Sequence, residues 1–218
     1  MTPEEVRARQ VAKALLTIGA VSFAPTRPFT WTSGLKAPIY CDNRLLISYP
    51  HLRRTVIEGF QEIIEFWELM PEVIAGTATA GIPYAAWLAD RMELPMVYVR
   101  SQPKTHGQGR QIEGRLEPGQ RVVLVEDLIS TGGSSVAAAE ALRAADAHVE
   151  AVLAIFTYDL PEAEQRFAQA ELPLHTLTNL PALIEVAREH DLLDDHTAEV
   201  LDEWRTDPYG WSEAHSET

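Results

Sequence analysis

Two adjacent carboxylates in the middle of the chain end an apolar run and precede a segment rich in glycine and hydroxyl groups. Glu126 and Asp127 follow the branched apolar residues 122–125, and residues 130–134 lead into an alanine-rich run. Carboxylates accept hydrogen bonds from sugar hydroxyls, and amides of a glycine turn at a helix start attract phosphate. This order indicates a site for a phosphorylated sugar. The alternative is an ordinary buried strand with an acidic end and a tight turn.

A second glycine-bounded loop precedes this motif by one strand and one helix. Residues 77–81, Thr-Ala-Thr-Ala-Gly, follow the short apolar run 73–76 and open into a further helical run. Such a loop suits a second anion, although a tight strand-to-helix turn explains it equally well on its own.

Cations are scarce in this acidic chain, yet several gather in one polar loop. Arg100, Lys104 and His106 fall within residues 100–119, which also contain several glycines. Polar loops of this length in compact domains are usually functional lids or disordered segments. A mobile cationic loop can close over a polyanion and exclude water, whereas the ordinary interpretation is a set of solvated charges.

Apolar runs that alternate with helical patterns must position these groups. This alternation predicts an α/β fold with a mainly parallel central sheet flanked by helices. Ligands of open parallel sheets bind beyond the carboxyl ends of the strands, where both loops are expected. The first part of the chain does not alternate and predicts a small N-terminal hood, containing two short strands around Gly34.

Length and composition predict one domain of 218 residues. We expect a helix and hood over about residues 1–70, an α/β core over about 71–205 and a loose polar tail at 206–218. The formal net charge of -14 disfavours a nucleic-acid surface. The one cysteine excludes an intrachain disulfide and a cysteine-based metal cluster. Without a secretory signal or an apolar run of membrane-spanning length, we expect a cytoplasmic protein with no membrane partner.

Two stretches carry a family resemblance. The run Val-Val-Leu-Val-Glu-Asp-Leu-Ile-Ser-Thr-Gly-Gly resembles the phosphoribosyl-diphosphate signature of the type I phosphoribosyltransferases. The lid pattern Arg-x-x-x-Lys-x-His-Gly, together with Thr-Ser-Gly-x-Lys-x-Pro-Ile-Tyr-Cys-Asp-Asn-Arg, resembles the Gram-positive-like branch of the orotate phosphoribosyltransferases.

The resemblance implies transfer of the 5-phosphoribosyl group from phosphoribosyl diphosphate to orotate N1, in de novo pyrimidine (UMP) biosynthesis. It implies Mg²⁺ held mainly by substrate diphosphate and ribose oxygens, with no metal site made by the protein alone. It also implies a homodimer in which the lid reaches the neighbouring subunit's site. Alternatives are a phosphoribosyltransferase for another nucleobase, such as a purine or xanthine, and a non-catalytic regulator that senses phosphoribosyl diphosphate.

The resemblance also assigns roles residue by residue. Lys104 and Asp127 are the expected catalytic groups. The residues expected to bind phosphoribosyl diphosphate are Arg100, Lys104, His106, Glu126, Asp127, Leu128, Ile129, Ser130, Thr131, Gly132, Gly133, Ser134, Thr77, Ala78, Thr79, Ala80 and Gly81. The residues expected near orotate are Ser130, Tyr40, Cys41, Lys36 and Arg44.

One departure concerns the orotate carboxylate. Some branches bind it with an arginine where this chain has Tyr158. Arg44, in the hood beside the base-lining segment, could supply that charge, or it could form a structural salt bridge. The sequence leaves both roles open.

Overall fold

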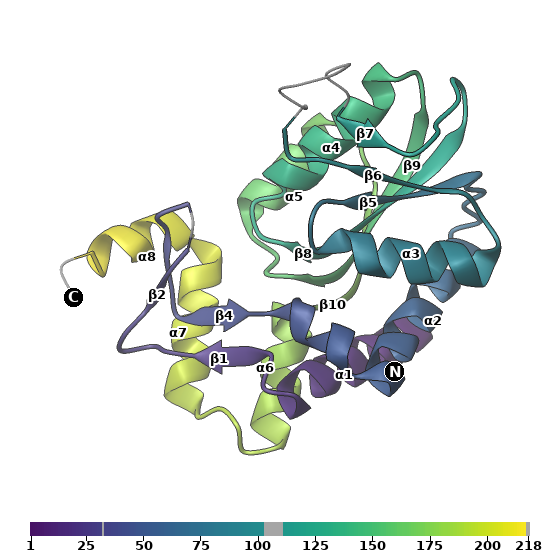
Figure 1. The fold of residues 1–218 in the computed structure, drawn as a ribbon. Helices are drawn as coiled ribbons and strands as arrows, with labels where there is room; N and C mark the ends of the chain where they lie inside the picture. Colours follow the sequence, from purple (N-terminus) through teal and green to yellow (C-terminus); the bar gives the residue numbers. More distant parts are fainter. Residues whose placement is uncertain (32, 103–110, 217–218) are drawn as a thin grey trace.

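The computed structural model describes residues 1–31, 33–102 and 111–216. A six-stranded sheet forms its centre, with the strand order β10-β9-β8-β5-β6-β7 (Figure 1). All neighbouring strands are parallel except β6 and β7, which are antiparallel. The predicted mainly parallel α/β fold is therefore confirmed. The strands of this sheet are β5 (Val73–Thr77), β6 (Met96–Val99), β7 (Ile112–Glu113), β8 (Arg121–Ile129), β9 (His148–Thr157) and β10 (Leu174–Asn179).

Strand β8 lies inside the sheet and is apolar on both faces. Val123 and Val125 belong to the core beneath the N-terminal helices, whereas Val122 and Leu124 belong to the core on the opposite face. All of these side chains are fully buried. A strand covered on both sides needs apolar residues at successive positions, which is why the sequence shows a continuous run rather than an alternation.

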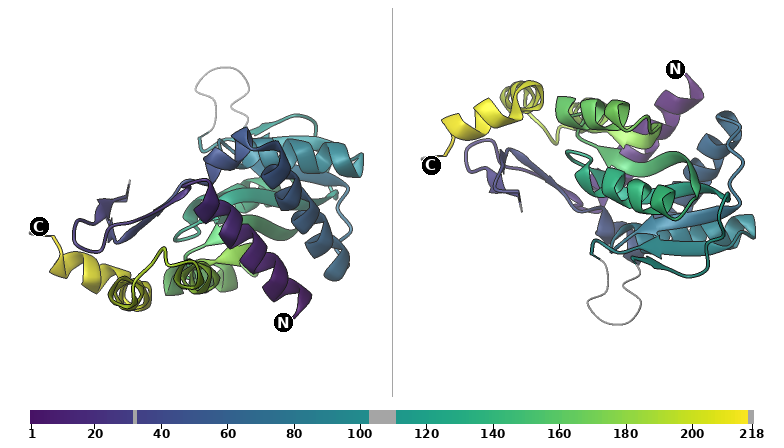
Figure 2. Two further views of the ribbon diagram at one scale, coloured as in Figure 1. Left: turned by 90° about the horizontal axis from the view of Figure 1, so that it is seen from below. Right: turned by 90° about the horizontal axis from the view of Figure 1, so that it is seen from above.

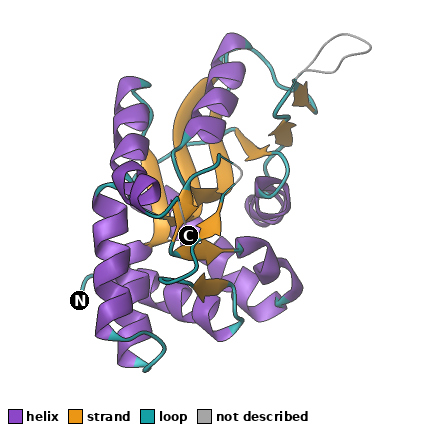
Figure 3. Ribbon diagram, turned by 90° about the vertical axis from the view of Figure 1, so that its left-hand side faces the viewer, coloured by secondary structure: helices purple, strands orange, loops and turns teal. Residues whose placement is uncertain are grey.

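Helices cover both faces of the sheet (Figures 2 and 3). The helices α1 (Pro3–Thr17), α2 (Pro50–Phe66) and α3 (Gly81–Met92) pack against one face. The helices α4 (Gly133–Ala144) and α5 (Pro161–Gln169) pack against the other. Helix α1 starts with a capping box, because Thr2 and Glu5 satisfy each other's backbone amides. None of the described helices combines the length and apolar character needed to cross a membrane.

The hood consists of residues 20–42 and packs beside the C-terminal helices. Strand β1 (Val21–Phe23) pairs antiparallel with β4 (Ile39–Cys41), and β2 (Phe29–Thr30) pairs with β3 (Lys36–Ala37). The 3-10 helix η1 (Asn43–Ser48) joins this unit to α2. The chain ends in α6 (Leu180–Glu189), α7 (Asp195–Thr206) and α8 (Pro208–Ala214). Figure 1 shows the yellow C-terminal helices beside the hood strands, far from them in sequence.

Three expectations need correction. The polar stretch 100–119 contains β7, which pairs with β6. The tail expected to be loose contains α8, whose Trp211 is only 8% exposed because it packs into the main core. The helix and hood expected over about residues 1–70 divide further, because the hood strands end at Cys41 and α2 packs against the main sheet. In the first two cases, the polarity of the sequence hid the packing interactions.

Candidate active site

A cavity of about 620 Å³ lies beyond the carboxyl ends of β5 and β8, between the main sheet and the hood. Its walls come from four separate stretches, namely residues 30–44, the loop after β5, the end of β8 with the loop that follows it, and Tyr158 just after β9. They include most of the residues singled out from the sequence. The lining residues are Thr30, Trp31, Ser33, Tyr40, Cys41, Asp42, Arg44, Thr77, Ala78, Thr79, Ala80, Glu126, Asp127, Leu128, Ser130, Ser134 and Tyr158.

The acid pair forms the floor of this cavity. Glu126 is only 5% exposed, and its carboxylate accepts hydrogen bonds from the Asp127 amide at 3.0 Å and from the Ser135 hydroxyl at 3.3 Å. Burial, reinforced by the adjacent Asp127 carboxylate, raises the pKa of Glu126 well above its usual range. Burial also raises the pKa of Asp127. Two buried carboxylates side by side are poorly compensated by the protein alone, and polar ligand groups would relieve this cost.

The loop after the acid pair has the backbone shape of an anion site. Gly132 precedes α4 with φ of 78°, in the left-handed region that glycine adopts without steric cost. A Cβ atom there would lie 2.8 Å from Cε2 of Phe167. Ser130 and Ser134 line the cavity, whereas Ile129 is buried in the core below. The loop therefore presents hydroxyls and the N-terminus of α4 to the cavity.

The second loop lies beside the first because β5 and β8 are neighbouring parallel strands. A Cβ atom on Gly81 would lie 2.3 Å from the carbonyl oxygen of Val125, so α3 starts directly against the strand that carries the acids. Thr77 is 5% exposed, and its hydroxyl has no hydrogen-bond partner within the described residues. Thr77 also lines the cavity. A buried hydroxyl without a partner, on a residue beside a cavity, is a candidate for binding a ligand oxygen.

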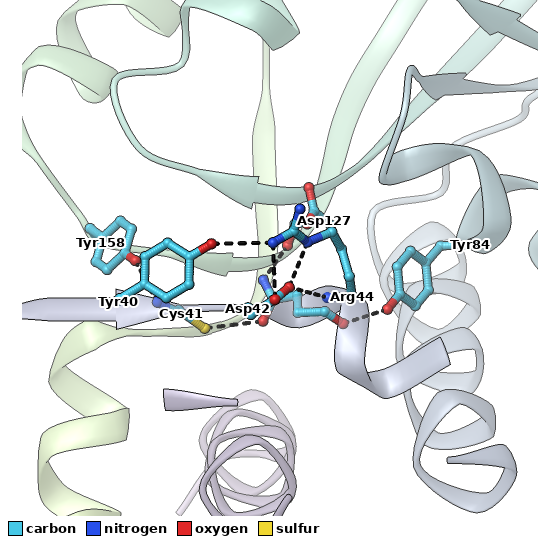
Figure 4. A network of polar contacts seen from close by, with 8 residues as sticks. Tyr40, Cys41, Asp42, Arg44, Tyr84, Asp127 and Tyr158 are labelled. Atoms are coloured by element: carbon cyan, nitrogen blue, oxygen red, sulfur yellow. Dashed lines mark hydrogen bonds and ion pairs between the residues drawn. The ribbon is translucent and has the colours of Figure 1, made fainter. Parts of the chain in front are cut away.

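The base-lining segment is held by Tyr158 (Figure 4). The backbone N–H of Cys41 donates to the Tyr158 hydroxyl at 3.0 Å. The Tyr158 ring contacts Trp31 and Trp204, with centroids 4.8 Å and 5.6 Å away. Tyr158 is therefore a buried residue that fixes strand β4.

Arg44 reaches the cavity and also forms a salt bridge. Its Nε donates to Asp42 at 2.6 Å, and its Nη2 donates to the Tyr40 hydroxyl at 3.2 Å. The hydrogen bond from Arg44 holds the pKa of Asp42 below its ordinary value. The Arg44 side chain nevertheless remains 57% exposed and lines the cavity. The observed salt bridge is thus compatible with a second role toward an anionic ligand.

Some expected site residues do not line the cavity. Lys36 is absent from its walls, although the paired residue Thr30 is present. Arg100 forms an ion pair with Glu113 at 3.5 Å, on the edge of the sheet. Thr131, Gly132, Gly133 and Gly81 shape the two loops rather than line the cavity. Lys104 and His106 lie outside the described residues.

Two residues that the sequence analysis did not assign contribute to the site from below. Asn43 is fully buried and its Nδ2 donates to the Asp127 carbonyl at 2.7 Å. The Tyr84 hydroxyl, on α3, donates to the Asn43 carbonyl at 2.7 Å. Asn43 lies within the Asp-Asn-Arg motif, so the sequence did offer a signal for giving it a role in the site. Tyr84 carried no sequence signal beyond its place on an apolar helix face.

A parallel sheet with an acid pair, two anion loops and a hood over one cavity defines a phosphoribosyltransferase of the type I fold. In agreement, the family model for the phosphoribosyl transferase domain matches residues 49–166. That match covers the core of the sheet and both loops.

Whole-chain relatives define the family more narrowly. The chain is 55% identical to an orotate phosphoribosyltransferase of Lactiplantibacillus plantarum over 94% of this chain and 96% of the relative. It is 53% identical to that of Bacillus caldolyticus over 92% of this chain and 97% of the relative. The chain belongs to the orotate phosphoribosyltransferase family, a group of pentosyltransferases.

Solved structures agree with this assignment. The orotate phosphoribosyltransferase of Aeropyrum pernix superposes with a TM-score of 0.70 at 28% identity, covering 84% of this chain and 99% of that one. The UMP synthase of Leishmania donovani superposes with a TM-score of 0.78 at 27% identity, covering 90% of this chain and 42% of that one.

Proposed function

We propose that the protein transfers the 5-phosphoribosyl group of phosphoribosyl diphosphate to N1 of orotate in the formation of UMP. A bond forms between N1 and the anomeric carbon, and the bond from that carbon to the diphosphate oxygen breaks. N1 gives up its proton to solvent, and orotidine 5'-monophosphate and pyrophosphate result. The observation that carries this proposal is the meeting of the acid pair, both anion loops and the base-lining segment around one cavity. No protein nucleophile is needed, because the reaction depends on positioning and charge stabilisation.

The sugar-phosphate side of the cavity binds phosphoribosyl diphosphate. Glu126 and Asp127 accept hydrogen bonds from the ribose hydroxyls and so compensate the burial that raises their pKa values. Residues 130–134 enclose the 5'-phosphate at the start of α4. Residues 77–81 bind the diphosphate, and the hydroxyl of Thr77 finds there the partner that it lacks within the described part of the protein.

The hood side binds orotate. Tyr40 and Cys41 line the cavity from strand β4, and Ser130 lines it from the loop after β8. Ser130 contacts the base where it joins the sugar. Arg44 provides a positive charge on this wall for the orotate carboxylate. We assign Lys36 a peripheral role at most, because it does not line the cavity.

Mg²⁺ is compatible with the donor set of this site. No group of three or more His, Cys, Asp or Glu side chains within the described residues could hold a metal by itself. Mg²⁺ prefers oxygen ligands and commonly uses one or two carboxylates together with substrate phosphates and water. The carboxylates of Asp42, Glu126 and Asp127 line the cavity, and Asp42 is already paired with Arg44. Glu126 and Asp127 would therefore hold the ion, with most of its ligands coming from the substrate. Bound Mg²⁺ would neutralise charge on the departing diphosphate.

The cationic lid belongs to the same proposal. Lys104 stabilises charge on the leaving diphosphate, with Arg100 and His106 as further cations. Arg100 does not line the cavity of its own chain. A lid that reaches a neighbouring subunit accounts for this position and requires a homodimer. Location in the cytoplasm stays a prediction from the sequence.

A direct assay tests the proposed reaction. Orotate is mixed with phosphoribosyl diphosphate and Mg²⁺, and the loss of orotate absorbance is followed. Adenine, guanine, xanthine and uracil serve as competing acceptors in parallel reactions with product separation. Of these acceptors, we expect only orotate to be turned over. Turnover of a purine in its place would instead identify a phosphoribosyltransferase for another nucleobase.

A further inference from the structure

Asn43 lies where three parts of the cavity meet, and its side chain is completely buried. It follows strand β4 at the start of η1. Its amide Nδ2 donates to the Asp127 carbonyl at 2.7 Å, and its Oδ1 accepts from the Cys41 thiol at 3.2 Å. Its own carbonyl accepts from the Tyr84 hydroxyl at 2.7 Å. One residue is therefore bonded to the base-lining segment, the acid pair and helix α3.

These partners belong to elements that are far apart in sequence. Cys41 lies on β4, Asp127 on β8, and Tyr84 on the helix that starts at the end of the diphosphate loop. Cys41 and Asp127 line the cavity, whereas Tyr84 and Asn43 do not. Contact with substrate is thus not its role in this arrangement.

The donors in this network remain protonated at neutral pH. Burial, with the nearby Asp127 carboxylate, raises the pKa of the Cys41 thiol and of the Tyr84 phenol. Each group therefore keeps the proton that it donates. Buried hydrogen bonds with every partner present give one preferred geometry, and loss of one partner leaves others unsatisfied.

We propose that Asn43 is a positioning residue that holds the base-lining segment, the acid pair and the start of α3 in one register. Orotate N1 and the anomeric carbon bind to different walls, so the distance between them depends on how these walls are joined. Misplacement by about 1 Å can cost roughly 10²-fold in rate. This inference deepens the proposed function and rests on it.

Asn43→Asp provides a sharp test because it keeps the shape and removes the donor. Ionised, the new carboxylate cannot donate to the Asp127 carbonyl, whereas protonated it can. Its proton will be held to unusually high pH by burial and by the neighbouring acids. The ionisable groups around this position are Cys41, Asp42, Arg44, Tyr84 and Asp127.

We expect the kcat of Asn43→Asp to be reduced about 10²-fold at the highest pH at which the variant stays folded, where the carboxylate is ionised. The ratio of variant to wild-type kcat should then rise several-fold as the pH is lowered. Asn43→Ala should lose a similar factor and show no such recovery. Melting temperatures measured at each pH separate a rate effect from unfolding. The positioning role would be overturned if the ratio of Asn43→Asp kcat to wild-type kcat did not change with pH and the loss of activity matched the loss of folded protein.

Tyr84→Phe keeps the test decisive should both Asn43 variants fail to fold. It removes only the hydroxyl that donates to Asn43 and leaves the ring in place. We expect kcat to fall several-fold with a smaller change in the Michaelis constants, and the exposed Tyr49→Phe to behave as wild type. Unchanged kcat in Tyr84→Phe would contradict the positioning role of Asn43. Absence of orotate turnover in the wild type would instead reject the proposed function. In that case, weaker binding of phosphoribosyl diphosphate by the same variants in calorimetry would support the positioning role of Asn43, and unchanged binding would contradict it.

Discussion

The two sides of the cavity are built in different ways. The sugar-phosphate side consists of two continuous loops, each placed directly at the carboxyl end of a parallel strand. The orotate side combines residues 30–44 with Tyr158 and the C-terminal helices. The first side is set by its own strand and helix, whereas the second depends on packing between segments more than 100 residues apart.

This difference predicts a division of kinetic effects. Changes on the sugar-phosphate side should act on kcat and on the KM for phosphoribosyl diphosphate. Changes in the hood should act on the KM for orotate. The four predictions below test this division. Any variant that changes the KM for orotate and the KM for phosphoribosyl diphosphate equally would weaken it.

The largest effect is expected at Lys104, which the family resemblance places on the diphosphate. Lys104→Ala should lower kcat about 10²- to 10³-fold, because one stabilising charge is lost in the transition state. Its Michaelis constants should change much less. The matched control is Lys13→Ala, an exposed lysine on α1. Equal activity of the two variants in the orotate absorbance assay would remove Lys104 from the mechanism.

Arg44→Ala should raise the KM for orotate by roughly 10-fold or more, since a charge-assisted hydrogen bond contributes about 1.5–3 kcal/mol. The KM for phosphoribosyl diphosphate should stay constant. Arg27→Ala, an exposed hood arginine, is the control. Asp42→Asn tests the rival role, because it weakens the Arg44 salt bridge but keeps the positive charge. If orotate affinity survives in Arg44→Ala, the arginine has only a structural role.

Glu126→Gln should separate stability from binding. Burial raises the pKa of Glu126 above its ordinary value of 4.5, so the folded state favours the neutral carboxyl. Wild-type stability from this group is present at low pH and declines as the pH rises from about 4.5 through the raised pKa. Glutamine cannot ionise, so the melting temperature of the variant relative to wild type should increase across that window. Binding of phosphoribosyl diphosphate should weaken at the same time.

Thermal melts from pH 4 upward and calorimetry with phosphoribosyl diphosphate provide both measurements. A constant difference in melting temperature across the pH range would show that Glu126 is not a costly buried charge.

The smallest effect is expected at the contact between α8 and the hood. The backbone N–H of Lys36 donates to the Ser212 hydroxyl at 2.9 Å, and the Trp204 Nε1 donates to the Lys36 carbonyl at 3.1 Å. Ser212→Ala should cost about 1 kcal/mol of stability and raise the KM for orotate a few-fold. Ser216→Ala, which removes a hydroxyl bonded only within the last turn, is the control. An altered KM for phosphoribosyl diphosphate alone would contradict the division between the two sides.

Local patterns were enough to predict much of the sugar-phosphate side. The run around Glu126 and Asp127 predicted its strand, loop and helix correctly, because each feature depends on residues adjacent in sequence. The 77–81 loop was ambiguous by itself, and the packing of Gly81 against Val125 shows why it lies beside the acids. The tail was misjudged because the burial of Trp211 depends on a partner surface that no local pattern reveals.

The sequence by itself determined the fold class, the acid pair and the anion loops, since strand periodicity, glycine positions and loop chemistry are local properties. Only the tertiary structure decided that Tyr158 supports the base wall, that Lys36 lies away from the cavity and that Asn43 joins three elements. Hydrogen bonds between distant segments form only once the whole core has packed. Their partners therefore become identifiable only when the complete chain is seen in three dimensions.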